Sequence, residues 1–184
     1  MSLISIPPSV AASPGASQPL LDAVHKQLGS VPNLFRLIGV SPAGLEGFLG
    51  LHGALGKGSL DLKTRNRIAL AVAEANGCNY CLAAHTYLGK NLAKLSDEEI
   101  LTNRDGGSTD ARADAAVRFA VLVTQKRGHV DADAIRDVQQ AGYTDAQIIE
   151  IIAHVALNTF TNYLNETVQT DIDFPAVSPP RAAA

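Results

Sequence analysis

Two cysteines and one histidine lie close together near the middle of the chain, and their types and spacing favour redox chemistry. Cys78 and Cys81 are three positions apart, and His85 follows four positions later. On a helix that begins near Cys78, these positions fall along one face over two turns, so both thiols and the imidazole share one site. The same spacing lets the two sulfurs close a disulfide within one turn.

The start of a helix also activates thiols. Its unpaired N–H groups and its dipole stabilise a thiolate, which lowers a cysteine pKa from ~8.5 into the range ~3.5–7.5. His85, one turn after Cys81, is placed to accept the thiol proton or to pass it on. The residues therefore favour a redox dithiol over a hydrolytic site, with Cys81, Cys78 and His85 as candidate catalytic residues.

Cys-x-x-Cys also occurs in other settings, and the neighbouring sequence excludes some of them. A thioredoxin fold requires a strand before the motif, whereas an alanine-rich helical segment precedes it here. Covalent haem attachment requires histidine directly after the second cysteine, where this chain has Leu82. One alternative function stays open: a zinc-binding or purely structural helical interaction module. Cys78, Cys81 and His85 would then hold three of the four zinc positions, or the cysteines would only pack.

The elements that must position these residues are predicted to be helices. Apolar residues recur at helical spacing in the segments 113–124 and 148–159, and no stretch alternates long enough for a sheet. We expect an all-α protein of about seven helices of ordinary length. Segment 62–75 is almost continuously apolar after Arg67, which predicts a buried central helix before the helix that carries the cysteines.

Composition sets limits on domain organisation and on partners. The chain has 184 residues, 46% of them hydrophobic, and a net charge of −3 with scattered Lys and Arg. This is ample for a core and gives no basic patch for nucleic acid or for a membrane surface. No apolar run approaches the ~18 residues of a membrane span. We expect a cytoplasmic protein with a flexible arm at 1–20, one domain at 21–174 and a flexible tail at 175–184.

Two segments carry a resemblance to a known family. RNRIALAVAEANGCNYCLAAH and LNTFTNYLNETVQTDIDFP resemble the alkylhydroperoxidase D-like (AhpD-like) family, in the peroxidase-related branch of the carboxymuconolactone decarboxylase-like superfamily. The resemblance covers about residues 20–175. It implies an AhpD-like helical bundle that assembles into homo-oligomers such as trimers or hexamers. True carboxymuconolactone decarboxylases lack the two cysteines, so lactone decarboxylation is not expected.

The resemblance also implies an activity. It is the reduction of small organic hydroperoxides in antioxidant defence, with an external thiol or lipoyl-type donor and with no metal or other cofactor. Cys81 resembles the peroxidatic thiol, Cys78 the more accessible resolving thiol, and His85 the relay histidine. Because the chain has no third cysteine, the reductant is expected to come from another molecule.

One position departs from the family pattern. Twelve residues before Cys78 the family has a glutamate that ends the proton relay, and this chain has Asn66. An amide cannot accept a proton at neutral pH, so we expect a slower peroxidase, or one that serves mainly as a disulfide reductase. Glu74 is the nearest carboxylate, and apolar neighbours would raise its pKa, so it is a further candidate catalytic residue. Alternatively, it is a partly exposed residue at a helix end.

Other polar residues are predicted to be structural. Glu150 and His154 are four positions apart on an apolar helix, a spacing compatible with an internal pair or with a contact to the site. A structural histidine that is hydrogen-bonded to its neighbours is favoured. Asn158, Asn162 and Asn165 form a polar stripe later on the same helix. We expect this stripe to make hydrogen bonds between helices or subunits, and not to take part in catalysis.

Overall fold

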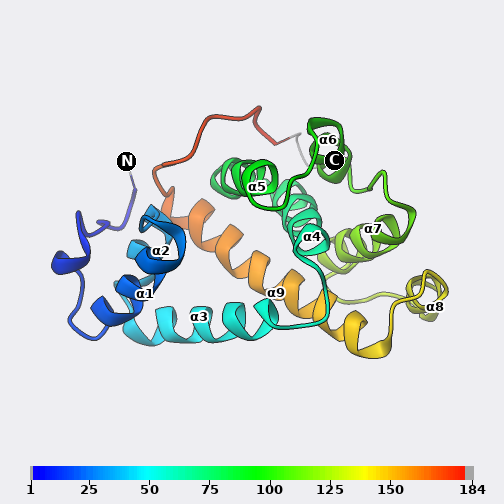
Figure 1. The fold of residues 1–184 in the computed structure, drawn as a ribbon, viewed down its shortest axis with the longest axis horizontal. Coiled ribbons are helices and arrows are strands. Elements are labelled where there is room, and N and C mark those ends of the chain that lie inside the picture. Colours follow the sequence, from blue (N-terminus) through cyan, green and yellow to red (C-terminus); the bar gives the residue numbers. More distant parts are fainter. Residues whose placement is uncertain (1, 181–184) are drawn as a thin grey trace.

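The computed structural model describes residues 2–180, and within them the protein is entirely helical (Figure 1). It contains one short 3-10 helix, nine α-helices and no strand in this range, so the all-α prediction is confirmed and the expected number of helices was too low. The 3-10 helix is Val10–Ala12, and the α-helices are α1 (Gln18–Leu28), α2 (Asn33–Ile38), α3 (Pro42–Gly56), α4 (Leu62–Ala75), α5 (Asn79–Asn91), α6 (Asp97–Arg104), α7 (Ala111–Gln125), α8 (Ala132–Gln140) and α9 (Asp145–Val168). None of the described helices is long and apolar enough to cross a membrane.

Polar side chains define where the helices around the cysteines begin. Asp61 accepts a hydrogen bond from the Thr64 amide at the start of α4, and Thr144 forms a capping box with Gln147 at the start of α9. Such caps satisfy backbone N–H groups that have no partner inside the helix. They fix the first turns of α4 and α9, the two described helices with the most buried residues.

Helix α4 lies at the centre of the molecule. Ten of its 14 residues are buried, and α5, α6, α7 and α9 all pack against it. Its run of alanines lets neighbouring backbones approach closely, as the sequence predicted. The predicted order, a buried central helix followed by the helix with the cysteines, is therefore confirmed.

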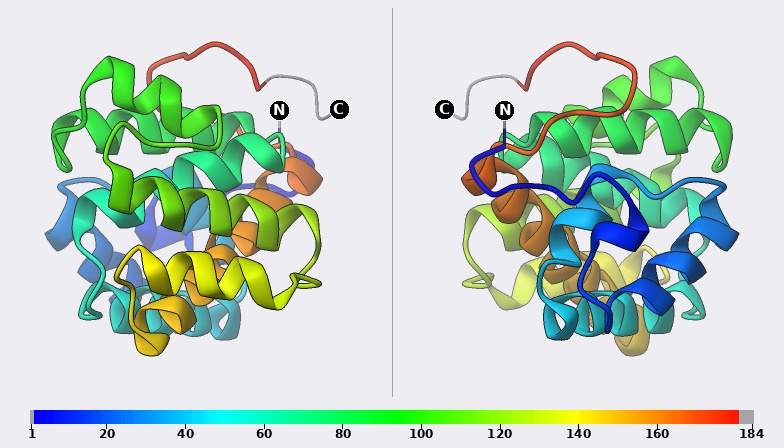
Figure 2. Two further views of the ribbon diagram at one scale, coloured as in Figure 1. Left: turned by 90° about the vertical axis from the view of Figure 1, so that its right-hand side faces the viewer. Right: turned by 90° about the vertical axis from the view of Figure 1, so that its left-hand side faces the viewer.

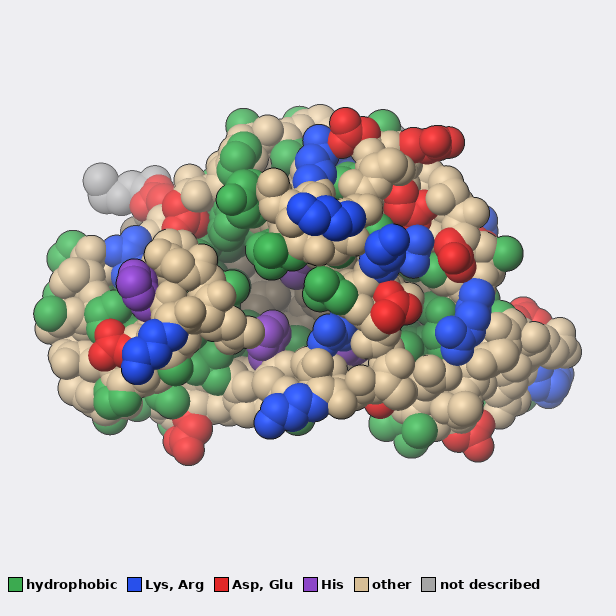
Figure 3. Space-filling view, viewed as in Figure 1, with side chains coloured by type: hydrophobic (Ala, Val, Ile, Leu, Met, Phe, Trp, Pro, Cys, Tyr) green, Lys and Arg blue, Asp and Glu red, His purple; other side chains and the backbone are tan. Residues whose placement is uncertain are grey.

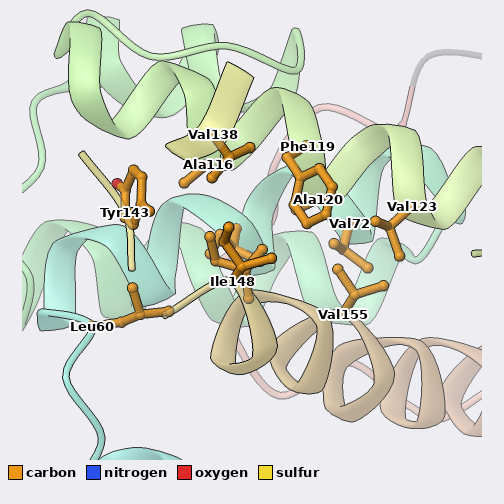
Figure 4. Packing of buried hydrophobic residues seen from close by; sticks show 12 residues of the cluster. Leu60, Val72, Ala116, Phe119, Ala120, Val123, Val138, Tyr143, Ile148 and Val155 are labelled. Carbon is orange, nitrogen blue, oxygen red and sulfur yellow. The ribbon is translucent and has the colours of Figure 1, made fainter. Parts of the chain in front are cut away.

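The largest apolar cluster forms where α4, α7 and α9 meet. Figure 4 shows Val72 of α4, Phe119 of α7, and Ile148 and Val155 of α9 directed toward one another. All four side chains are buried. Burying one such side chain contributes roughly 1.5–3 kcal/mol. This cluster holds α9 against α4 and so fixes the position of the later part of α9, which reaches the cysteines.

Both ends of the described chain pack on the helices. The Leu3 amide donates to the Val168 carbonyl at 2.7 Å, and Ser17 Oγ donates to the Gly39 carbonyl at 2.7 Å. After α9 the chain crosses the outside of α5, where it appears in red in Figures 1 and 2. The predicted division into arm, domain and tail stays a prediction, and its positions 1 and 181–184 lie outside the described residues.

Candidate active site

The two cysteines lie at the junction of α4 and α5. Helix α4 ends at Ala75, and Gly77 turns the chain with a φ of +70°, a left-handed conformation that favours glycine. Cys78 is then the N-cap of α5, and its Sγ accepts a hydrogen bond from the Cys81 amide at 3.2 Å. The structure therefore brings both thiols to the start of one helix, as the spacing predicted.

The two thiols differ in their tendency to ionise. Burial opposes the thiolate of Cys81, but hydrogen bonds from the Cys78 thiol and from side chains of α9 outweigh it and lower the pKa of Cys81. The hydrogen bond that the Cys78 thiol makes to Cys81, together with burial, raises the pKa of Cys78. Cys81 is therefore the thiol that ionises first. The expected greater access to Cys78 is wrong in this structure, because Cys78 is 0% exposed and Cys81 is 3% exposed.

Helix α9 contributes the hydrogen-bond donors around Cys81. Asn165 Nδ2 donates to Cys81 Sγ at 3.3 Å, and Thr161 and Asn162 also face this sulfur. The predicted hydrogen bonds between helices are thus present, since Asn165 contacts Cys81 of α5 and Asn162 accepts from Asn76 at the end of α4. That one of their partners is a thiol was not predicted. The signal in the sequence was the stripe itself, since repeated buried amides on an apolar helix require partners.

His85 lies beside Asn66 and not beside a carboxylate. Its Nδ1 is 3.4 Å from Asn66 Oδ1, while Asn66 Nδ2 donates to the His85 carbonyl at 3.1 Å. Burial, with the nearby His52, lowers the pKa of His85 to about 4 despite a hydrogen bond to Asn158. The imidazole is therefore neutral at neutral pH. Within residues 2–180, His85 makes no hydrogen bond to either sulfur.

Glu74 lies in a different environment from the one its sequence neighbours indicated. It is buried, and its Oε2 is 2.7 Å from Arg104 Nε of α6. The same guanidinium donates to Ser178 Oγ at 2.9 Å and to the Pro179 carbonyl at 3.1 Å. The carboxylate of Glu74 is therefore paired with a guanidinium in addition to its apolar neighbours. The ion pair connects α4 with α6 and with the segment after α9.

A cavity of about 350 Å³ lies next to this site. Figure 3 shows it as a hollow with histidine side chains inside and hydrophobic side chains around its rim. It is lined mainly by apolar and aromatic residues of α1, α2, α3, α5 and α9, with polar groups from His52, His85, Asn158 and Thr161. No Asp, Glu, Lys or Arg of the described chain lines it. Thr161 belongs both to the cavity wall and to the group around Cys81, so the cavity ends close to the sulfur of Cys81.

Tyr80, between the cysteines, connects the cavity with the segment after α9. Its hydroxyl accepts from the Leu34 amide at 3.1 Å and donates to Asp173 Oδ1 at 2.8 Å. Its ring meets Phe174 edge-on, with centroids 5.7 Å apart, and both rings line the cavity. Phe174 therefore closes one side of the cavity next to α5, and Asp173 holds the hydroxyl of the neighbouring Tyr80.

Two further predictions concern metals and the pair on α9. Among residues 2–180, no three His, Cys, Asp or Glu side chains are grouped so that they could hold a metal ion. Glu150 accepts hydrogen bonds from the amides of Ser59 and Leu60, so it orders the connection between α3 and α4. His154, one turn later, is buried, and its Nε2 has no hydrogen-bond partner in the described part of the chain.

Comparison with known proteins decides the family. Residues 42–126, which include Asn66, both cysteines and His85, match the carboxymuconolactone decarboxylase family. A peroxidase-related protein from Ralstonia eutropha, described as an alkylhydroperoxidase AhpD core, has the same fold, with a TM-score of 0.82 and 26% identity over 94% of this chain and 92% of that one. The family match and this structure together support placing the chain in the AhpD-like branch of the carboxymuconolactone decarboxylase superfamily.

Other solved structures share the fold at lower identity. A peroxidase-related protein from Silicibacter has a TM-score of 0.78 and 23% identity over 92% of this chain and 91% of that one. The debrominase Bmp8, in complex with 2,3,4-tribromopyrrole, has a TM-score of 0.78 and 20% identity over 94% of each chain. No curated protein matches the chain in sequence. The resemblance seen in the two sequence segments is thus confirmed, and the fold alone is compatible with more than one chemistry.

Proposed function

We propose that this AhpD-like protein is a thiol-dependent peroxidase that reduces small organic hydroperoxides with Cys81 and Cys78. The observation that carries the proposal is the pair of thiols at the start of α5, with the pKa of Cys81 lowered and that of Cys78 raised. Cys81 is thus the sulfur that ionises and attacks, and Cys78 stays a protonated thiol until it reacts with the oxidised Cys81. The peroxidase-related protein of known structure that shares 26% identity supports the same reaction class.

The reaction requires two steps and an external donor. The Cys81 thiolate attacks the terminal oxygen of the hydroperoxide, the O–O bond breaks, and the departing alkoxide takes up a proton to become an alcohol. The sulfenic acid on Cys81 then reacts with the Cys78 thiol, which forms a disulfide and releases water. An external dithiol supplies two electrons and two protons by thiol–disulfide exchange and restores both cysteines.

His85 is assigned to the departing oxygen in this proposal. The imidazole is neutral and lines the cavity one turn after Cys81, so it can donate a hydrogen bond where negative charge develops. Asn66 contacts the other side of the ring but cannot remove a proton from it. We therefore expect turnover to be slower than in a site with a carboxylate at this position.

The cavity supports the choice of substrate. Apolar and aromatic side chains surround about 350 Å³ with no charged side chain among the described lining residues. Such surroundings favour an uncharged organic group over hydrogen peroxide or an ionised acid. The homo-oligomeric state, the cytoplasmic location and the thiol or lipoyl-type donor remain predictions from the resemblance.

The test is consumption of cumene hydroperoxide with dithiothreitol as the reductant. We expect wild-type protein to consume the hydroperoxide with one cumyl alcohol formed for each disulfide reduced, and Cys81→Ser to lose this activity while remaining folded. The matched control is Ile149→Ala on α9, because the Ile149 side chain is exposed.

A defined negative result would overturn the proposal. Folded wild-type protein with two free thiols that consumes no hydroperoxide is not a peroxidase of this kind. A debrominase shares the fold, so bromide release from 2,3,4-tribromopyrrole is measured in parallel. Bromide release without hydroperoxide consumption would assign the same two thiols to reductive dehalogenation instead.

A further inference from the structure

Two buried asparagines of α9 point amide nitrogens at the sulfur of Cys81. Asn165 is 2% exposed, and its Nδ2 donates to Cys81 Sγ at 3.3 Å. Asn162 is 0% exposed and also faces the sulfur. Its Nδ2 has no hydrogen-bond partner among residues 2–180. One amide NH₂ group near the sulfur, that of Asn165, therefore donates a hydrogen bond to it, and the second, that of Asn162, has no acceptor among the described residues.

The orientation of Asn162 is set by the segment that precedes the cysteines. Asn76 Nδ2 donates to Asn162 Oδ1 at 2.9 Å. Because the carbonyl oxygen of Asn162 is occupied in this way, its NH₂ group is the end that remains for Cys81. Asn76 ends α4 and is followed by Gly77, so the turn that places Cys78 also fixes this donor.

A thiolate suits these donors better than a thiol does. A neutral sulfur is a weak acceptor, whereas hydrogen bonds to a charged acceptor are about twice as strong as neutral ones. A buried donor without a partner is unfavourable, and ionisation of Cys81 supplies Asn162 with an acceptor. Both amide NH₂ groups thus find a strong acceptor only in the charged state of the sulfur.

We propose that Asn165 and Asn162 hold Cys81 as a thiolate, so that helix α9, and not His85, sets the reactivity of the sulfur. The inference rests on the proposed function in one respect only, that Cys81 is the attacking thiol. His85 is left free to act on the substrate oxygen, which agrees with its lack of a hydrogen bond to either sulfur in the described residues.

The other groups that face the two thiols do not replace these donors. The Cys78 thiol donates to Cys81 from the same helix. Tyr80 gives its hydroxyl proton to Asp173 on the segment after α9. Glu166 of α9 accepts from the Asn79 amide, and its negative charge raises the pKa of Cys78. These charges disfavour a thiolate near the start of α5, so its stabilisation comes from neutral donors, which are the Cys78 thiol and side chains of α9 that include the two amides.

The experiment measures the ionisation of Cys81 directly, without any hydroperoxide. In a Cys78→Ser background, the ultraviolet absorbance of the thiolate is followed against pH, with the Cys78→Ser, Cys81→Ser protein as the baseline. Serine keeps a hydroxyl donor and a favourable N-cap at position 78. Adding Asn165→Leu, which has a similar shape but no N–H, should raise the midpoint by about one pH unit.

Asn158→Leu is the matched control on the same helix. Asn158 is also buried, but it donates to the His154 carbonyl and makes no contact with Cys81 Sγ among the described residues. We expect its midpoint to stay within about a third of the shift caused by Asn165→Leu. Circular dichroism establishes that each variant is folded, and if Asn165→Leu fails to fold, Asn165→Ala, which only removes atoms, is titrated instead.

The results separate this inference from the peroxidase proposal. A raised midpoint in the Asn165 variant alone supports the amide donors, whatever the hydroperoxide assay shows. An unchanged midpoint, or equal shifts for the variants at 158 and 165, would overturn the inference and leave the peroxidase assignment untouched. His85→Phe tests the competing explanation. A larger shift of the thiolate midpoint in His85→Phe than in Asn165→Leu would show that the histidine, and not α9, sets the ionisation of Cys81.

Discussion

Helix α9 presents two different surfaces to its neighbours along its length. Up to Val155 it packs apolar side chains such as Ile148 and Ile151 into the cluster with α4 and α7. From Asn158 to Asn165 the same helix turns amide and hydroxyl groups toward α5 and Cys81. Both parts are buried, so the difference is in chemistry and not in depth.

The comparison assigns stability to the apolar part of α9 and, under the proposed function, reactivity to its polar part. Replacing a buried polar pair by apolar groups of the same shape is often neutral or stabilising, so packing alone gives no reason for these asparagines. Asn162 Nδ2 and Asn165 Oδ1 even lack hydrogen-bond partners among residues 2–180. The apolar part of α9 holds the fold together, and the polar part is arranged around a sulfur.

The largest effect on this comparison is expected from Cys81→Ser. A serine hydroxyl does not ionise near neutral pH, so hydroperoxide reduction should fall by at least about a thousandfold. The smaller side chain can still accept from Asn165, so the free energy of unfolding should change by less than about 1 kcal/mol. Initial rates and urea unfolding check the two halves of this prediction, and a variant that kept full activity would end the assignment.

Ile151→Ala should produce the reverse pattern. Ile151 is 0% exposed in the apolar cluster, and its truncation should lower the free energy of unfolding by about 2–5 kcal/mol. The pKa of Cys81 should not move, because the cavity opens far from the amide donors along α9. Ile149→Ala, whose side chain is 67% exposed, is the matched control in urea unfolding and thiolate titration. A shifted thiolate midpoint in Ile151→Ala would show that the two parts of α9 are not separate.

The free energy of unfolding is expected to depend on pH through two buried histidines, His154 of α9 and His85 of α5. Burial lowers the pKa of His154 and of His85 to about 4, against 6.5 in an unfolded chain. The unfolded chain therefore binds more protons as the pH falls. Their contribution to stability is complete above pH 6.5 and is lost progressively toward pH 4, by at most about 1.4 kcal/mol per pH unit for each histidine.

Urea unfolding across this pH window measures that loss. His154→Leu should flatten the pH dependence of the free energy of unfolding, since Leu at this position takes up no proton. His129→Leu is the control, because His129 is exposed and should leave the slope unchanged. Equal slopes in wild type and His154→Leu would contradict the assigned burial effect.

The smallest effect is expected from Asn66→Asp. A carboxylate of the same shape beside His85 Nδ1 would give the imidazole a proton acceptor and raise its pKa. We expect turnover of cumene hydroperoxide to rise by about threefold to tenfold, which is less than the roughly 10²–10⁴-fold that a fully developed general acid–base catalyst contributes. Little space surrounds the Asn66 amide, since a methyl group added at Gly89 would lie 2.6 Å from its Nδ2. The replacement at position 66 must therefore keep the shape of asparagine, as aspartate does. An unchanged rate in folded protein would show that position 66 does not limit turnover.

The sequence predicted the local part of this site and missed the part made by tertiary contacts. Cys78, Cys81 and His85 lie within two turns of one helix, so their spacing and the preceding Gly77 were enough to place them. The contact between Cys81 and Asn165 joins residues 84 positions apart. No periodicity specifies which sulfur an asparagine on a distant helix will meet.

Glu74 is a second example of a tertiary contact that the local sequence did not predict. Its sequence neighbours are apolar, which predicted apolar surroundings for the carboxylate, but α6 brings Arg104 Nε to 2.7 Å from it. The all-α class and the central helix followed from hydrophobic patterning, since burial of α4 on all sides requires apolar residues on all sides. Ion pairs between helices follow from how the helices pack, and that information is spread over the whole chain.

Mass spectrometry after a single oxidation tests the central claim most directly. Reduced wild-type protein and Cys78→Ser are each mixed with one equivalent of cumene hydroperoxide in the absence of a reductant. We predict that the wild type loses two hydrogen masses as the disulfide forms, and that Cys78→Ser gains one oxygen mass on Cys81. Oxygen on position 78 in Cys81→Ser at the same rate, or unchanged masses in folded wild-type protein, would contradict the account.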